Sequence, residues 1–97
     1  MARPSAALRD AIVRQIAEDA KDTDLGSWPR RHFANQQLLF LNGNAAFFWY
    51  LDLEGRVYWC DHDTVRMELE LENDPETIRT AITARAQSFP ALAELLG

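Results

Sequence analysis

The fold is decided by residues 36–72, which read QQLLFLNGNAAFFWYLDLEGRVYWCDHDTVRMELELE. Apolar and aromatic runs alternate here with short segments rich in Asn, Asp and Gly, the residues that favour tight turns. The last eight residues alternate apolar with charged side chains, a pattern typical of a strand with one buried and one solvated face. We therefore expect four antiparallel strands joined in sequence order, a β-meander.

The expected strands cover residues 37–41, 45–53, 56–60 and 65–72. The second run is apolar on both faces, so it should lie in the middle of the sheet and be covered on both sides. The fourth run separates its side chains by face. Its buried face should carry Val65, Met67, Leu69 and Leu71, and its solvated face Arg66, Glu68, Glu70 and Glu72.

Helices are expected on either side of this meander. Residues 5–21 place Leu8, Ile12 and Ile16 on one helical stripe, with Ser5 as the N-cap. Asp74 followed by Pro75 is a strong start signal for a second helix, which should continue to about residue 86, and a short last helix should cover 91–96. The chain is therefore predicted to be one α+β domain over residues 1–97, with its two C-terminal helices packed on one sheet face.

Length and composition restrict the class of protein. The 97 residues, 47% of them apolar, suit one small domain that folds without disulfides or metal. No apolar run approaches the roughly 20 residues of a membrane-spanning helix. The single Cys60 has no partner for an internal disulfide, and the N-terminus lacks a signal-peptide pattern, so we expect a cytoplasmic protein.

The negative charge is concentrated in one segment. Residues 52–76 contain nine acidic and two basic side chains, whereas the segments before and after them each carry a net charge of +1. Such a surface repels the phosphate backbone and attracts basic proteins. The charge distribution argues against nucleic-acid binding and favours a protein partner.

The motif Cys60-Asp61-His62-Asp63 contains metal-ligand side chains, but adjacent strand residues point to opposite faces and could not converge on one ion. A Cys–His pair two residues apart at a strand end is also poor geometry for nucleophilic catalysis. We expect turn chemistry for both aspartates and a small buried apolar role for Cys60. The sequence therefore predicts no metal, no cofactor and no enzymatic activity.

The acidic side chains around the fourth strand are the candidate binding residues. Glutamates two apart on a strand lie about 7 Å from each other, and such like-charge rows lower stability. They either bind a partner or protect a sheet edge against association. The candidate partner-binding residues are Asp61, Asp63, Glu68, Glu70 and Glu72.

The run FFWYLDLEGRVYWCDHDT at residues 47–64 resembles the central hairpin of the SUKH superfamily, with its apolar strand, Asp-x-x-Gly turn, Val-Tyr and His-Asp. Residues 88–96, SFPALAELL, resemble the closing helix of that family. The superfamily includes a yeast regulator of cell-wall synthesis and many bacterial immunity proteins. The resemblance covers about half of the chain.

The resemblance implies an immunity protein that binds and neutralises a toxin delivered by neighbouring bacteria. Toxins of this kind are often nucleases or deaminases with basic grooves, which the acidic segment 52–76 would complement. The alternative is a small non-enzymatic adaptor or regulatory domain that binds a host protein and forms a homodimer through its exposed sheet.

Overall fold

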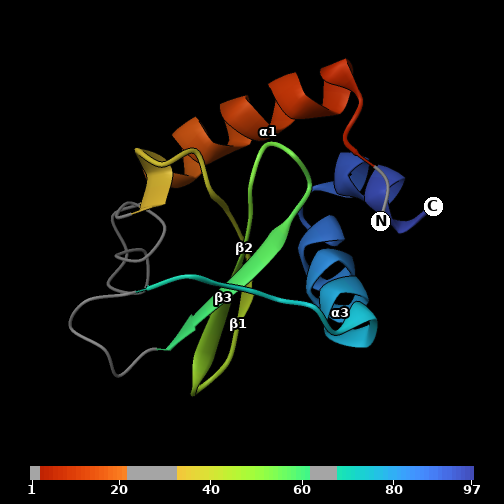
Figure 1. The fold of residues 1–97 in the computed structure, drawn as a ribbon. Helices are drawn as coiled ribbons and strands as arrows, with labels where there is room; N and C mark the ends of the chain where they lie inside the picture. The colour runs from red at the N-terminus through yellow and green to blue at the C-terminus, as the bar shows by residue number, and fades with distance from the viewer. Residues whose placement is uncertain (1–2, 22–32, 62–67) are drawn as a thin grey trace.

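The computed structural model describes residues 3–21, 33–61 and 68–97. In Figure 1 the helices lie over one side of a twisted sheet, with α1 across one end and α3 alongside it. The elements in chain order are α1 (Ala6–Asp19), β1 (Leu39–Gly43), β2 (Phe47–Leu51), β3 (Val57–Asp61), β4 (Glu70–Leu71), α3 (Pro75–Ala86) and the 3₁₀ helix η2 (Pro90–Leu96). The predicted α+β class is confirmed.

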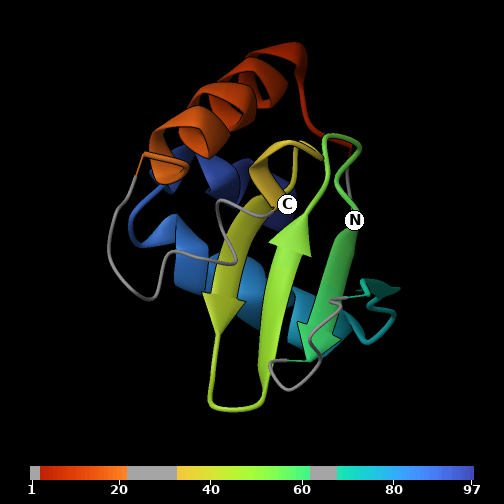
Figure 2. The ribbon, with the colours of Figure 1, turned by 90° about the vertical axis from the view of Figure 1, so that its left-hand side faces the viewer.

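The sheet is the expected meander, with the strand order β1-β2-β3-β4 and antiparallel pairing throughout. As predicted, β2 is central and buried on both faces. Leu51 belongs to the main core beneath the helices, whereas its neighbour Tyr50 belongs to a smaller core on the opposite face, and both are fully buried. Figure 2 shows this opposite face in front, with α3 behind the sheet.

The helices α1, α3 and η2 all contribute to the main core because each presents an apolar stripe to the same sheet face. The side chains of this core come from α1 (Leu8, Ile12, Ile16), the sheet (Leu39, Leu41, Leu51, Val57), α3 (Ala81, Ile82) and the C-terminal segment (Phe89, Leu92, Leu95). The predicted caps are also present. Ser5 accepts a hydrogen bond from the Leu8 amide, and Asp74 accepts one from the Thr77 amide. These bonds satisfy amides that the first helical turns leave unpaired.

The fourth strand differs from the prediction. Among the described residues it comprises only Glu70 and Leu71, which pair with Trp59 and Tyr58 of β3; residues 65–67 of the expected strand lie outside them. Leu71 is 47% exposed, so the expected burial of this face is wrong there. The physical reason is topological. The helices cover the other face of the sheet, and the small core opposite them includes Leu69 at its margin but does not cover Leu71.

Two glycines of the meander are required for different reasons. Gly55, after β2, has φ 88°, a left-handed conformation that an L side chain rarely adopts. Gly43, at the end of β1, does not have a positive φ; a Cβ there would lie 2.8 Å from Cδ1 of Phe48. A hairpin does follow this Asn-Gly-Asn segment, but Asn42 and Gly43 belong to β1 and pair with Trp49 and Phe48, so the turn begins only at Asn44. Gly43 is needed instead for the close approach of the Phe48 ring.

Candidate protein-interaction surface

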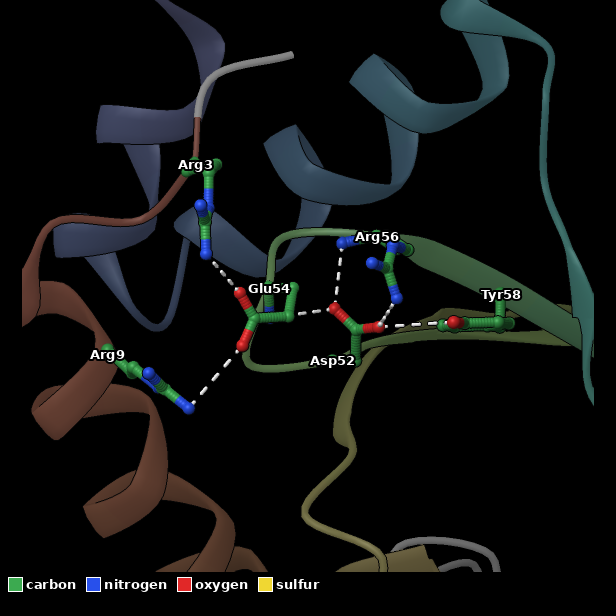
Figure 3. A network of polar contacts seen from close by, with 6 residues as sticks. All are labelled: Arg3, Arg9, Asp52, Glu54, Arg56 and Tyr58. Carbon is green, nitrogen blue, oxygen red and sulfur yellow. Dashed lines mark hydrogen bonds and ion pairs between the residues drawn. The ribbon is translucent and has the colours of Figure 1, made fainter.

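The acids of the β2–β3 turn are occupied within the chain. Figure 3 shows Glu54 between two arginines from the N-terminal part of the chain. One carboxylate oxygen accepts a hydrogen bond from Arg3 at 2.7 Å, and the other lies 3.5 Å from the Arg9 guanidinium. The hydrogen bond from Arg3 and the charge of Arg9 lower the pKa of Glu54. Glu54 therefore ties the start of α1 to the sheet.

Asp52 organises the same turn. Its Oδ1 accepts the backbone amides of Glu54 and Arg56, both at 2.9 Å, and its Oδ2 accepts the Tyr58 hydroxyl at 3.1 Å (Figure 3). The Arg56 guanidinium also lies 3.7 Å from Oδ2. This carboxylate satisfies local backbone donors, so neither turn acid is available for a partner without cost to the fold.

Two further acids stabilise the start of α3. Asp74 accepts hydrogen bonds from both the amide and the hydroxyl of Thr77, and these bonds lower its pKa. Glu72, which the sequence assigned to partner binding, is half-buried and accepts the Asp74 amide at 2.8 Å. Glu72 therefore has a local structural role in addition to any external one.

Three acids remain without such a role. Glu68, Glu70 and Glu76 are exposed and form no hydrogen bond or ion pair with the described residues. Because β4 leads directly into α3, Glu70 and Glu76 are only six residues apart along the chain. Sequence reasoning did not include Glu76 among the candidate binding residues. It could have been recognised as a binding candidate from its place in the acidic segment.

The other predicted binding residues are placed differently. Asp61 is half-buried at the end of β3, opposite Phe47 in the strand register, and has an interaction of its own. Asp63 lies outside the described residues, as does His62. The structure thus groups Glu68, Glu70, Glu72 and Glu76 along β4 and the start of α3. We call these four residues the acidic edge.

Half-buried aromatic side chains lie beside the acidic edge. Glu70 pairs with Trp59, and alternation along β3 places Trp59 on the same face as Val57 of the main core. On that face Phe47 makes edge contacts with Trp59, centroids 5.1 Å apart, and with Trp49, 6.2 Å apart. The three aromatic side chains therefore contact one another, although none of them is fully buried.

Cys60 has the environment of a structural thiol. It is fully buried in the smaller core, and burial, together with the nearby charge of Asp61, raises its pKa to about 11. The thiolate needed for nucleophilic attack is therefore disfavoured at neutral pH. Across residues 3–21, 33–61 and 68–97, no three His, Cys, Asp or Glu side chains gather in a geometry that could hold a metal ion.

Comparison of the chain with protein-family models, with curated proteins and with solved structures found no match. Within the described residues, no helix has both the length and the apolar character required to cross a membrane. The geometry of the acidic edge is consequently the basis for the functional proposal.

Proposed function

We propose that this chain is a non-enzymatic binding protein whose acidic edge binds a basic partner protein. The observation that carries the proposal is the contrast between two groups of acids in one segment. Asp52, Glu54 and Asp74 are engaged by donors of the chain itself, whereas Glu68, Glu70 and Glu76 are exposed and unengaged among the described residues. Unengaged like charges do not help the chain to fold, but they do complement a cationic surface.

The position of the acidic edge suits such binding. It combines an exposed sheet edge with the first turn of α3, and half-buried aromatics lie on the same sheet face. Interfaces commonly combine a charged rim with aromatic contacts at the centre. Electrostatic attraction would mainly accelerate association and would weaken at high ionic strength.

We infer that the partner is a toxin, and that the chain acts as an immunity protein in the cytoplasm. This step is supported by the resemblance of residues 47–64 and 88–96 to the SUKH superfamily. A nuclease or deaminase toxin has a basic substrate groove, and an acidic protein that occupied the groove would exclude the nucleic acid.

The test uses two variants with the same loss of charge. Glu68→Gln with Glu70→Gln removes two unengaged carboxylates of the acidic edge, whereas Asp10→Asn with Glu18→Gln removes two exposed carboxylates of α1. Each purified variant is titrated by surface plasmon resonance, at low and high salt, against a candidate toxin encoded by a neighbouring gene. Glu72 is left unchanged because its carboxylate accepts the Asp74 amide.

The acidic-edge variant should associate about tenfold more slowly at low salt and show a weaker salt dependence, while the α1 variant should match the wild type. Equal binding by all three proteins would remove the acidic edge from the interface. Co-expression with the toxin then tests neutralisation. Binding without protection of the cells would refute the immunity role and leave an adaptor role.

A further inference from the structure

A cavity lies between the β1–β2 hairpin and the first turns of α3. Its volume is about 430 Å³, and it is lined by Asn42, Asn44, Trp49, Asp74, Glu76, Thr77, Thr80 and Ala81. The two halves of the cavity differ in character. The strand side provides an indole ring and side-chain amides, and the helix side provides carboxylates and threonine hydroxyls.

A β-bulge builds the strand side. The register between β1 and β2 shifts between Phe40 and Asn42, so Leu41 is the extra residue. Leu41 is buried in the main core, and the next residue, Asn42, lies opposite Trp49 and lines the cavity. Bulges redirect side chains in this way and are frequent beside functional sites. The Asn42 side chain makes no hydrogen bond with the described residues, so its amide is available to a ligand.

The charge of the cavity is negative. Asp74 has a lowered pKa and is committed to Thr77, but Glu76 is exposed and unengaged among the residues described. Of the cations in the described parts of the chain, none lines the cavity. A partly exposed indole ring beside a carboxylate is the combination that attracts a cation, and the planar guanidinium also stacks on aromatic rings.

We propose that this cavity is the binding site for an arginine side chain of the basic partner. The guanidinium would stack on Trp49 and pair with Glu76, and the Asn42 side-chain oxygen would accept one of its remaining N–H groups. The inference rests on the proposed function, because it assigns one contact within that interface. The cavity adjoins the acidic edge through Glu76, so one basic segment of the partner could reach both.

The experiment titrates ¹⁵N-labelled protein with N-acetyl-arginine methylamide and follows its spectra. N-acetyl-citrulline methylamide serves as the neutral isostere. The indole N–H signal of Trp49 is the reporter and is assigned from its absence in Trp49→Phe. The arginine probe should shift this signal and the amides of Thr77 and Thr80 in a saturable way, and the citrulline probe should not.

Two variants make the test specific. Glu76→Gln should weaken the response to the arginine probe about threefold, the effect of one partly exposed ion pair. Thr80→Phe changes an exposed helix position and should abolish the response by filling the cavity. Asp10→Asn, which removes an unengaged carboxylate of α1, should leave the response unchanged.

An equal shift with citrulline, or an unchanged response in Thr80→Phe, would overturn the proposed site. These outcomes are separate from those of the toxin experiment. If Glu68→Gln with Glu70→Gln slows association with the toxin but the arginine probe does not bind, the acidic edge stands and the cavity proposal fails. If the probe binds but the toxin associates equally with all variants, the proposed function fails instead.

Discussion

The buried ion pair between α1 and α3 gives the sharpest test of how the helices are held. Arg85 donates from Nη2 to both carboxylate oxygens of Asp19, at 2.9 and 3.0 Å, and the two side chains are only 10% and 11% exposed. Asp19 lies in the last turn of α1, where the helix dipole disfavours a negative charge. Its stabilising contribution must therefore come from its hydrogen bonds, which are those from Arg85 and one from Gln15 Nε2 to Oδ1 at 2.9 Å.

We expect Asp19→Ala to lower the free energy of unfolding by about 3 kcal/mol. Breaking a buried pair costs about 3–5 kcal/mol because the remaining charge is left desolvated and unpaired. We use the lower end of this range because both side chains keep some contact with water. In addition, the variant removes an unfavourable interaction between the Asp19 charge and the dipole of α1. For a domain of this size, the loss corresponds to a fall in melting temperature of about 15 °C.

Urea denaturation followed by circular dichroism measures this change, with two matched proteins. Glu18→Ala breaks the exposed pair with Lys21, whose side chains are 64% and 72% exposed, and should cost less than about 0.5 kcal/mol. Asp19→Ala combined with Arg85→Met replaces the pair by apolar groups and should recover most of the loss. A cost below 1 kcal/mol for Asp19→Ala, or a double variant no more stable than the single one, would refute the reasoning.

Three other predictions concern single residues. Gly43→Ala should lower the stability by about 1–2 kcal/mol in urea denaturation, because its Cβ would meet the Phe48 ring at 2.8 Å, and Phe48→Leu should reduce this cost. Cys60 at pH 8 should react with a disulfide reagent about 100-fold more slowly in the folded protein than in urea, since its pKa in the folded protein is about 11. Because this pKa is raised above that of the unfolded chain, the stability should also decrease as the pH rises from about 8.5 towards 11. A Cys60→Ala protein that kept the full decrease would contradict the assignment. Glu54 has a lowered pKa in the folded protein, so its contribution to stability is present above about pH 4.5 and is lost as the pH falls through that folded-state pKa. Arg3→Ala should move the NMR titration midpoint of Glu54 upward, and an unmoved midpoint would exclude the Arg3 contact.

Local signals in the sequence were sufficient for most of the fold. Ser5 and Asp74 cap helices because the capping bond involves an amide only three residues away. The exposure of Leu71 could not be inferred in the same way. Alternation shows that two faces of a strand differ, but which face the helices cover depends on packing between distant segments. Because the helices cover the face that carries Glu70, Leu71 lies on the opposite face and is exposed to solvent.

The candidate site was only partly accessible from the sequence. The acidic segment was evident from its charge. The engagement of Glu54 depends on Arg3, about 50 residues away in the chain, and so could not be read from local sequence, whereas Asp52 and Asp74 are engaged by nearby donors. The cavity at Trp49 depends on a bulge and on the packing of α3 against the hairpin, and neither leaves a clear local pattern. Arg85 did leave a signal, because a charged residue on the apolar stripe of a helix implies a buried partner.

The first helix of the chain is held largely by residues that are synthesised much later. The Ser5 amide and hydroxyl donate hydrogen bonds to the carboxylate of Glu94, at 2.8 and 2.9 Å, and Asp19 accepts hydrogen bonds from Arg85. On the ribosome, α1 therefore emerges long before its partners and must stay unaggregated while the sheet and α3 are made. Closure of the domain is coupled to the synthesis of Arg85 and Glu94. Chains stalled before residue 85 should remain accessible to proteases and chaperones along the part of the α1 stripe that packs against η2.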